Sequence, residues 1–136
     1  MRYLLDTNVC VRYLNGRSLA VRERLQATDV EDVAVCSVVK AELFYGAARS
    51  NNPQRTLASQ QQFLRLFVSL PFDDEAADIY GRIRAQLAAQ GTPVGSNDLQ
   101  IAAIALAHDL TLVTHNTGEF SRVEELLLED WEIADA

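Results

Sequence analysis

The segment Tyr3-Leu4-Leu5-Asp6, at positions 3–6, places a short apolar run directly before an acidic residue. An apolar run without polar alternation is typical of a strand that is buried on both faces, as strands of parallel sheets are. Similar runs recur at Val33–Cys36 and Leu110–Thr114, and helical patterns lie between them. The sequence therefore predicts an α/β protein with three layers, in which helices cover both faces of a central, mostly parallel sheet.

Caps and breakers set the expected boundaries of the other elements. Ser18, Ser37 and Asp73 are predicted helix N-caps, Pro53 suits a first helical turn, and Gly91-Thr92-Pro93 ends a helix. We expect helices over residues 9–14, 18–26, 37–49, 53–69, 73–90 and 98–108, a short strand at 70–72, and a final segment near 131–133 in which Trp131 anchors the last strand.

Length and composition predict one domain spanning residues 1–136. The chain is 49% hydrophobic, which is enough to build its own core. No apolar run approaches the ~18 residues of a membrane span, and the N-terminus lacks the features of a secretory signal. We therefore expect a soluble cytoplasmic protein without membrane contacts. Cys10 and Cys36 have no metal-ligand spacing and are interpreted as reduced packing residues.

The negative charge is concentrated at the C-terminus. Residues 119–136 contribute −6 of the formal net charge of −7, so the other 118 residues are nearly neutral. All but one of the 12 basic residues are arginine. If some acids face inward, the remaining surface is mildly positive, and the sequence pI of 4.7 does not exclude a nucleic-acid substrate.

Three acids interrupt apolar stretches where a hydrophobic residue or a cap would be expected: Asp6, Glu42 and Asp98. Two like charges ~4 Å apart cost about 4 kcal/mol at an effective dielectric of ~20, so convergent carboxylates usually serve a cation. Each acid also has a simpler interpretation. Glu42 could pair with a buried arginine, and Asp6 and Asp98 could only cap helices.

Oxygen donors without a nearby histidine or cysteine favour a hard cation, Mg²⁺ or Mn²⁺, over zinc. Mg²⁺ usually keeps several waters and completes its shell with substrate phosphates. A cation of this kind activates water and neutralises charge during phosphodiester hydrolysis. The three acids therefore indicate cleavage of a nucleic-acid backbone.

Four blocks occur in order along the chain: LLDTN at 4–8, AELFYGA at 41–47, GSNDLQIAA at 95–103 and LVTHNTGEF at 112–120. Together they resemble the signature blocks of the PIN-domain ribonucleases, specifically the VapC toxins of bacterial VapBC toxin–antitoxin modules. The resemblance implies a PIN-like fold and a Mg²⁺- or Mn²⁺-dependent endoribonuclease that arrests translation. It also implies a homodimer that a small VapB antitoxin neutralises in a toxin–antitoxin hetero-oligomer.

The resemblance also implies roles for individual residues. Asp6, Glu42 and Asp98 match the metal-binding acids of the family. Many PIN domains carry a fourth acid two residues after the threonine that corresponds to Thr114, where this chain has Asn116, followed by Glu119. Asn116 is taken as a catalytic residue through its amide oxygen. The predicted supporting residues are Thr7, Asn8, Thr114 and Glu119.

The favoured substrate is the anticodon region of a tRNA, with a ribosomal RNA loop as the next choice. Possible phosphate contacts are Arg12, Arg17, Arg49, Arg82 and Arg84, and His115 could contact RNA.

Two other classes of protein stay open at this point. A catalytically silent PIN-like module could bind RNA or protein, although the three acids argue against it. A receiver-like Mg²⁺-binding domain would need an adjacent acidic pair after the first strand and a late lysine, but the only lysine is Lys40.

Overall fold

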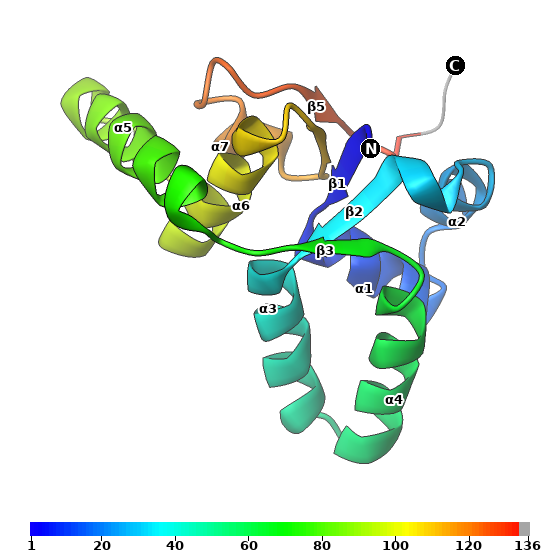
Figure 1. Ribbon diagram of the computed structural model, residues 1–136. Coiled ribbons are helices and arrows are strands. Elements are labelled where there is room, and N and C mark those ends of the chain that lie inside the picture. Colours follow the sequence, from blue (N-terminus) through cyan, green and yellow to red (C-terminus); the bar gives the residue numbers. More distant parts are fainter. Residues whose placement is uncertain (134–136) are drawn as a thin grey trace.

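The structure, a computed structural model, describes residues 1–133, and its α/β architecture agrees with the sequence prediction (Figure 1). The elements along the chain are β1 (Tyr3–Leu5), α1 (Thr7–Asn15), α2 (Leu19–Gln26), the 3₁₀ turn η1 (Val30–Asp32), β2 (Val33–Cys36), α3 (Ser37–Ala48), α4 (Pro53–Leu64), β3 (Val68–Leu70), α5 (Asp74–Gln90), α6 (Ser96–Ala107), β4 (Thr111–Val113), α7 (Thr117–Phe120) and β5 (Leu128–Glu129).

The described strands form one five-stranded sheet in the order β3-β2-β1-β4-β5, and every neighbouring pair is parallel. The sheet is therefore entirely parallel, where the sequence predicted a mostly parallel one. The chain builds outward from β1 to β3 and then returns to add β4 and β5 on the other side of β1. The direction of winding thus reverses between β1 and β4, and in open α/β sheets ligands bind outside the carboxyl ends of the strands at such a point.

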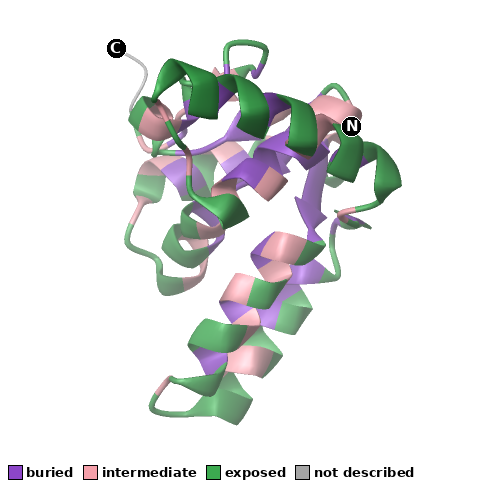
Figure 2. Ribbon diagram, turned by 90° about the vertical axis from the view of Figure 1, so that its left-hand side faces the viewer, coloured by how far each residue is buried: buried purple, intermediate pink, exposed green. Residues whose placement is uncertain are grey.

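The helices form a layer on each side of this sheet. In Figure 1, α5, α6 and α7 lie to one side of the strands and α1 and α2 lie to the other, while α3 and α4 form a hairpin that extends below the sheet. Helix α5 packs against α6, and α1 contacts α2, α3 and α4. The three inner strands, β1, β2 and β4, are largely buried (Figure 2). Leu4, Leu5, Leu112 and Val113 have no exposed surface.

Several predicted caps are confirmed. The side chain of Ser18 accepts a hydrogen bond from Val21 N, and that of Asp73 accepts one from Ala76 N. Pro53 opens α4, and Gly91 ends α5 in the left-handed conformation, with φ of 71°. These caps satisfy backbone groups that would otherwise lack partners at the helix ends.

Other predicted boundaries were wrong. Ser37 is the first residue of α3, and its N-cap is Cys36, whose side chain makes no capping bond. Helix α4 ends at Leu64 rather than near residue 69, and β3 lies at Val68–Leu70 rather than 70–72. The cause is tertiary, because Ala34–Cys36 of β2 offer hydrogen bonds to Val68–Leu70 that a longer helix would forfeit.

Two further expectations agree with the structure. Trp131 is 1% exposed and lies edge to face with Tyr3, with 5.2 Å between ring centroids, so it fixes the segment after β5 to β1. Cys10 and Cys36 are free and buried, and burial raises the pKa of both thiols. None of the helices within residues 1–133 is long and apolar enough to cross a membrane.

A candidate active site at the ends of β1 and β4

Asp6 lies at the carboxyl end of β1, where the winding of the sheet reverses. The residue is 5% exposed, and its carboxylate accepts two hydrogen bonds of 2.8 Å, from Thr7 N to Oδ1 and from Thr114 Oγ1 to Oδ2. Thr114 follows β4 and is fully buried, so the second bond joins the ends of the two central strands. Burial raises the pKa of Asp6, and the Thr114 hydroxyl partly offsets that rise. Asp6 also caps α1, so the capping interpretation holds alongside any chemical role.

Asp98 lies in the first turn of α6 and is partly buried. Burial, followed by the negative charges of Asp6, Glu119 and Glu42, raises its pKa to about 6. The N-cap of α6 is Gly95, so Asp98 is not the capping residue. The structure therefore brings Asp98 within electrostatic range of both other predicted acids.

Glu42 lies on α3, with one carboxylate oxygen enclosed by protein. Its Oε1 atom is buried and has no hydrogen-bond partner within residues 1–133. The alternative of a buried arginine partner is wrong for the described residues, because no salt bridge among them involves Glu42. An enclosed carboxylate oxygen without a donor is costly, and a cation is the partner that would satisfy it.

Glu119 joins the start of α6 to α7. Its carboxylate accepts hydrogen bonds of 2.9 Å from Gly95 N and from Asn116 Nδ2, and it shares a side-chain hydrogen bond with Asp98. The Gly95 N–H group, followed by Asn116, lowers the pKa of Glu119, whereas the pKa of Asp98 is raised. As pH falls, Asp98 is therefore protonated before Glu119. Glu119 thus contributes the fourth charge at this end of the sheet, and Asn116 orients it.

The remaining predicted residues differ in how they contribute. Asn116 N donates to Thr114 Oγ1 at 3.0 Å, so the Thr114 hydroxyl organises both Asp6 and the turn into α7. The Thr7 hydroxyl is buried and has no partner within the described chain. Asn8 is exposed on α1, and none of the hydrogen bonds described for residues 1–133 involves its side chain.

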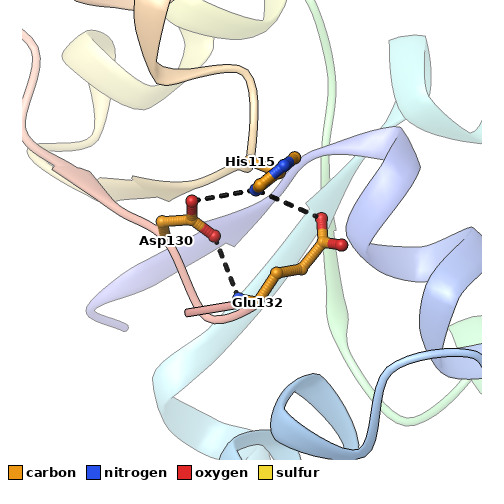
Figure 3. A group of neighbouring side chains, drawn as sticks. All are labelled: His115, Asp130 and Glu132. Atoms are coloured by element: carbon orange, nitrogen blue, oxygen red, sulfur yellow. Dashed lines mark hydrogen bonds and ion pairs between the residues drawn. The ribbon is translucent and has the colours of Figure 1, made fainter. Parts of the chain in front are cut away.

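The carboxylate oxygens of the site are not packed as tightly as ligands around an ion. Among the described residues, three side chains that could each offer a ligand atom do lie with those atoms within 4.8 Å of one another: His115, Asp130 and Glu132 (Figure 3). His115 Nδ1 lies 2.9 Å from Asp130 Oδ2, and Arg12 Nε lies 3.5 Å from Glu132 Oε1. Because these groups already pair with one another, they are explained as an ion-pair network that holds the C-terminal segment against β4 and α1.

Sequence reasoning missed the backbone N–H group of Gly95, which is the first cause of the lowered pKa of Glu119. Any residue except proline supplies such a donor, so the amino-acid type carries no signal for it. The position becomes informative only when α6 and α7 are placed beside each other.

Comparison with known proteins agrees with this architecture. Residues 3–126 match the PIN domain family. The chain is 41% identical over 131 residues to the tRNA(fMet)-specific endonuclease VapC of Shigella flexneri. This match covers 96% of the chain and 98% of the relative. It is 35% identical over 133 residues to ribonuclease VapC2 of Rickettsia felis, covering 97% of this chain and 99% of the relative.

Solved structures agree as well. DNA-bound VapBC from Salmonella typhimurium contains a chain that superposes with a TM-score of 0.91 at 37% identity, covering 96% of this chain and 98% of that one. VapBC2 from Rickettsia felis, bound to a DNA fragment from its promoter, gives a TM-score of 0.90 at 35% identity, with 96% and 99% of the two chains covered.

Proposed function

Since the chain belongs to the PIN-domain family, as a VapC ribonuclease toxin of a toxin–antitoxin system, we propose that Asp6, Glu42 and Asp98 bind the divalent cation with which it cuts RNA. The observation that carries this proposal is the shared electrostatics of the acids. Asp98 has a pKa of about 6 because burial and the charges of Asp6, Glu119 and Glu42 act on it together. Carboxylates held in this way gain most when a cation neutralises them.

The donor set fits Mg²⁺ or Mn²⁺. It consists of oxygen atoms alone, and it includes the enclosed Glu42 Oε1 that has no other partner among the described residues. When bound, such an ion supplies charge neutralisation at the scissile phosphate and activation of a water molecule. Glu119 is the fourth acid in this arrangement, and the Gly95 N–H and Asn116 amide that lower its pKa keep it ionised.

The supporting residues hold these carboxylates in place. The Thr114 hydroxyl donates to Asp6 and accepts from Asn116 N, so one buried group sets both sides of the site. The Asn116 amide donates to Glu119 and thereby places the turn into α7 beside α6. A rigid arrangement of this kind positions a phosphodiester for attack without reorganisation during the reaction.

The names of the relatives support the choice of substrate and partner. The Shigella flexneri and Salmonella typhimurium proteins are named tRNA(fMet)-specific endonucleases. By extension, we propose initiator tRNA, cut in its anticodon region in the cytoplasm, as the substrate. The related solved structures are VapBC complexes, which supports a VapB-type antitoxin for this chain, with the toxin as a homodimer inside a hetero-oligomer. A basic antitoxin side chain would satisfy the acids that the cation otherwise neutralises.

The test is cleavage of initiator tRNA by the full chain, with Asp6→Asn as the site variant and Glu23→Gln as its control. Asparagine keeps the size and the capping oxygen of Asp6, and Glu23 is an exposed acid on α2. We expect the wild type and Glu23→Gln to cleave with Mg²⁺ or Mn²⁺ and not in EDTA. Asp6→Asn should lose at least about 100-fold in cleavage while still unfolding cooperatively on heating, which shows that it is folded. Undiminished cleavage in excess chelator would refute the metal site. Tight RNA binding without cleavage under any metal would favour the silent binding module.

A further inference from the structure

The α3–α4 hairpin differs in charge from the rest of the chain. Residues 37–67 hold four of the 12 basic residues but only one of the 19 acidic residues, and that acid is Glu42 of the site. The hairpin extends away from the sheet, so its helices present much surface to solvent (Figures 1 and 2). An arm that is basic in an otherwise acidic protein, and that starts from the candidate site, is suited to contact a polyanion.

Tyr45 stands out on this arm. It is 63% exposed, although most aromatic side chains of the chain are packed. It follows Glu42 by three residues on α3, so the two side chains share one face of the helix, about 4.5 Å apart along its axis. The guanidinium of Arg49 lies 4.6 Å from the centre of its ring. Arg49 therefore lies over one face of a ring whose residue is still mostly exposed to solvent.

The structure also distinguishes among the arginines that the sequence offered as phosphate contacts. Arg12 pairs with Glu132, Arg82 pairs with Glu125, and Arg84 donates to Tyr80 Oη. Arg17 and Arg49 have no carboxylate partner within residues 1–133. Arg17 lies beyond the far end of α1 from Asp6, whereas Arg49 is the C-cap residue of α3, the helix that carries Glu42.

We propose that Tyr45 and Arg49 form a nucleotide-binding subsite, in which the Tyr45 ring stacks on an unpaired base beside the scissile bond and Arg49 binds the adjoining phosphate. This inference rests on the proposed ribonuclease function. Sequence-specific contacts to RNA target unstacked bases of loops, which pack on aromatic side chains. Base stacking tolerates any base, so Tyr45 supplies position along the strand rather than base identity.

The first experiment measures steady-state cleavage of an anticodon stem–loop RNA of initiator tRNA by the full chain. Tyr45→Leu should raise KM about 10-fold with kcat within about twofold, because one base–aromatic stack is lost. Tyr45→Phe, which keeps the ring, should stay within about twofold. Leu19→Ala on α2, where Leu19 is 70% exposed, is the control for loss of an exposed apolar side chain. Equal KM values for Tyr45→Leu and the wild type would overturn the subsite.

The second experiment identifies the base. Single abasic nucleotides are placed in turn on each side of the cleavage site. With the wild type, an abasic nucleotide at one of these positions should raise KM as much as Tyr45→Leu does. The same abasic RNA should cause no further rise in the KM of Tyr45→Leu. Additive effects at every position would contradict stacking on Tyr45.

The phosphate contact has its own measurement. Arg49→Gln should reduce the slope of log KM against log salt concentration by about 0.7, the value for one phosphate of a single strand. Arg17→Gln should leave this slope unchanged. Equal flattening by both variants would refute a local contact. If the wild-type chain cleaves no RNA, the proposed function itself is refuted. Changes in antitoxin affinity alone, with unchanged KM, would assign Tyr45 to a protein interface instead.

Discussion

Replacing Asp98 with asparagine should stabilise the metal-free protein while abolishing cleavage. Burial and the charges of Asp6, Glu119 and Glu42 raise the pKa of Asp98 to about 6. At neutral pH the ionised carboxylate therefore destabilises the folded chain relative to a neutral side chain of the same size. Asparagine removes that charge and can still donate a hydrogen bond to Glu119.

The pKa shift sets the scale of this effect. The ordinary pKa of an aspartate is 3.8, so a pKa of about 6 corresponds to about 3 kcal/mol, since a tenfold change in a proton affinity is 1.36 kcal/mol. Asp98 is only partly buried, so solvent screening reduces the figure to about 1.5 kcal/mol. The variant also loses a favourable negative charge in the first turn of α6, which reduces the gain in stability by about 0.5 kcal/mol. A net gain of about 1 kcal/mol should raise the melting temperature by about 3–5 °C.

The sign of the pH dependence follows from the raised pKa. Relative to the variant, the wild type keeps its full stability below the unfolded pKa of 3.8 and loses it as pH rises through about 6. The gain of Asp98→Asn at pH 5 should therefore be about half that at pH 8. Thermal unfolding in EDTA measures both, and the exposed Asp29→Asn is the control. Added Mg²⁺ should stabilise the wild type and not the variant. A variant no more stable than the wild type at pH 8 in EDTA, or a gain independent of pH, would refute the electrostatic account of the site.

Two further outcomes are expected. Thr114→Val should lower the free energy of unfolding by about 2 kcal/mol and reduce cleavage, because Asp6 Oδ2 and Asn116 N lose their hydrogen-bond partner. Thr114→Ser, which keeps the hydroxyl, should retain most of the stability and most of the cleavage, and urea unfolding and RNA cleavage of the two variants test this. The rate of cleavage at limiting Mg²⁺ should fall as pH decreases through about 6, because protonated Asp98 cannot bind metal. The midpoint of the pH–rate profile should move to lower pH as the Mg²⁺ concentration increases. A midpoint that does not depend on the Mg²⁺ concentration would contradict competition between protons and metal.

The central part of the fold could be predicted from the sequence because local pattern and tertiary environment agree there. Tyr3–Leu5 and Val33–Cys36 are apolar throughout, and both are buried strands with the predicted bounds. The prediction failed where tertiary pairing decided the outcome. Val68–Leu70 is only three residues long and two of them are exposed, yet it pairs with β2 at the edge of the sheet. The two-residue strand β5 and the single turn of α7 are too short for periodicity to reveal.

The candidate site shows the same division between what a chain encodes locally and what the fold adds. Asp6, Glu42 and Asp98 could be recognised because each places a charge in an apolar setting, which is visible along the sequence. The roles of Asn116 and Glu119 depend on which helix ends face each other. The sequence offered Asn116 as a replacement for a missing acid, but its amide donates to Glu119. The negative charge therefore lies three residues later, where the Gly95 N–H group stabilises it.

This displacement has a consequence for the chemistry. A fourth acid at position 116, two residues after Thr114, would place its charge on a residue whose N–H group shares the Thr114 hydroxyl with Asp6. That charge would raise the pKa of Asp6 beyond what burial already does. The charge of Glu119 is only the last cause of the raised pKa of Asp6. Glu119 lies on α7, where backbone and amide donors lower its pKa, whereas its charge raises the pKa of Asp98. We therefore expect protonation of Asp98 to govern the proposed metal binding, while Thr114 and Thr7 hold the carboxylate of Asp6 through two hydrogen bonds.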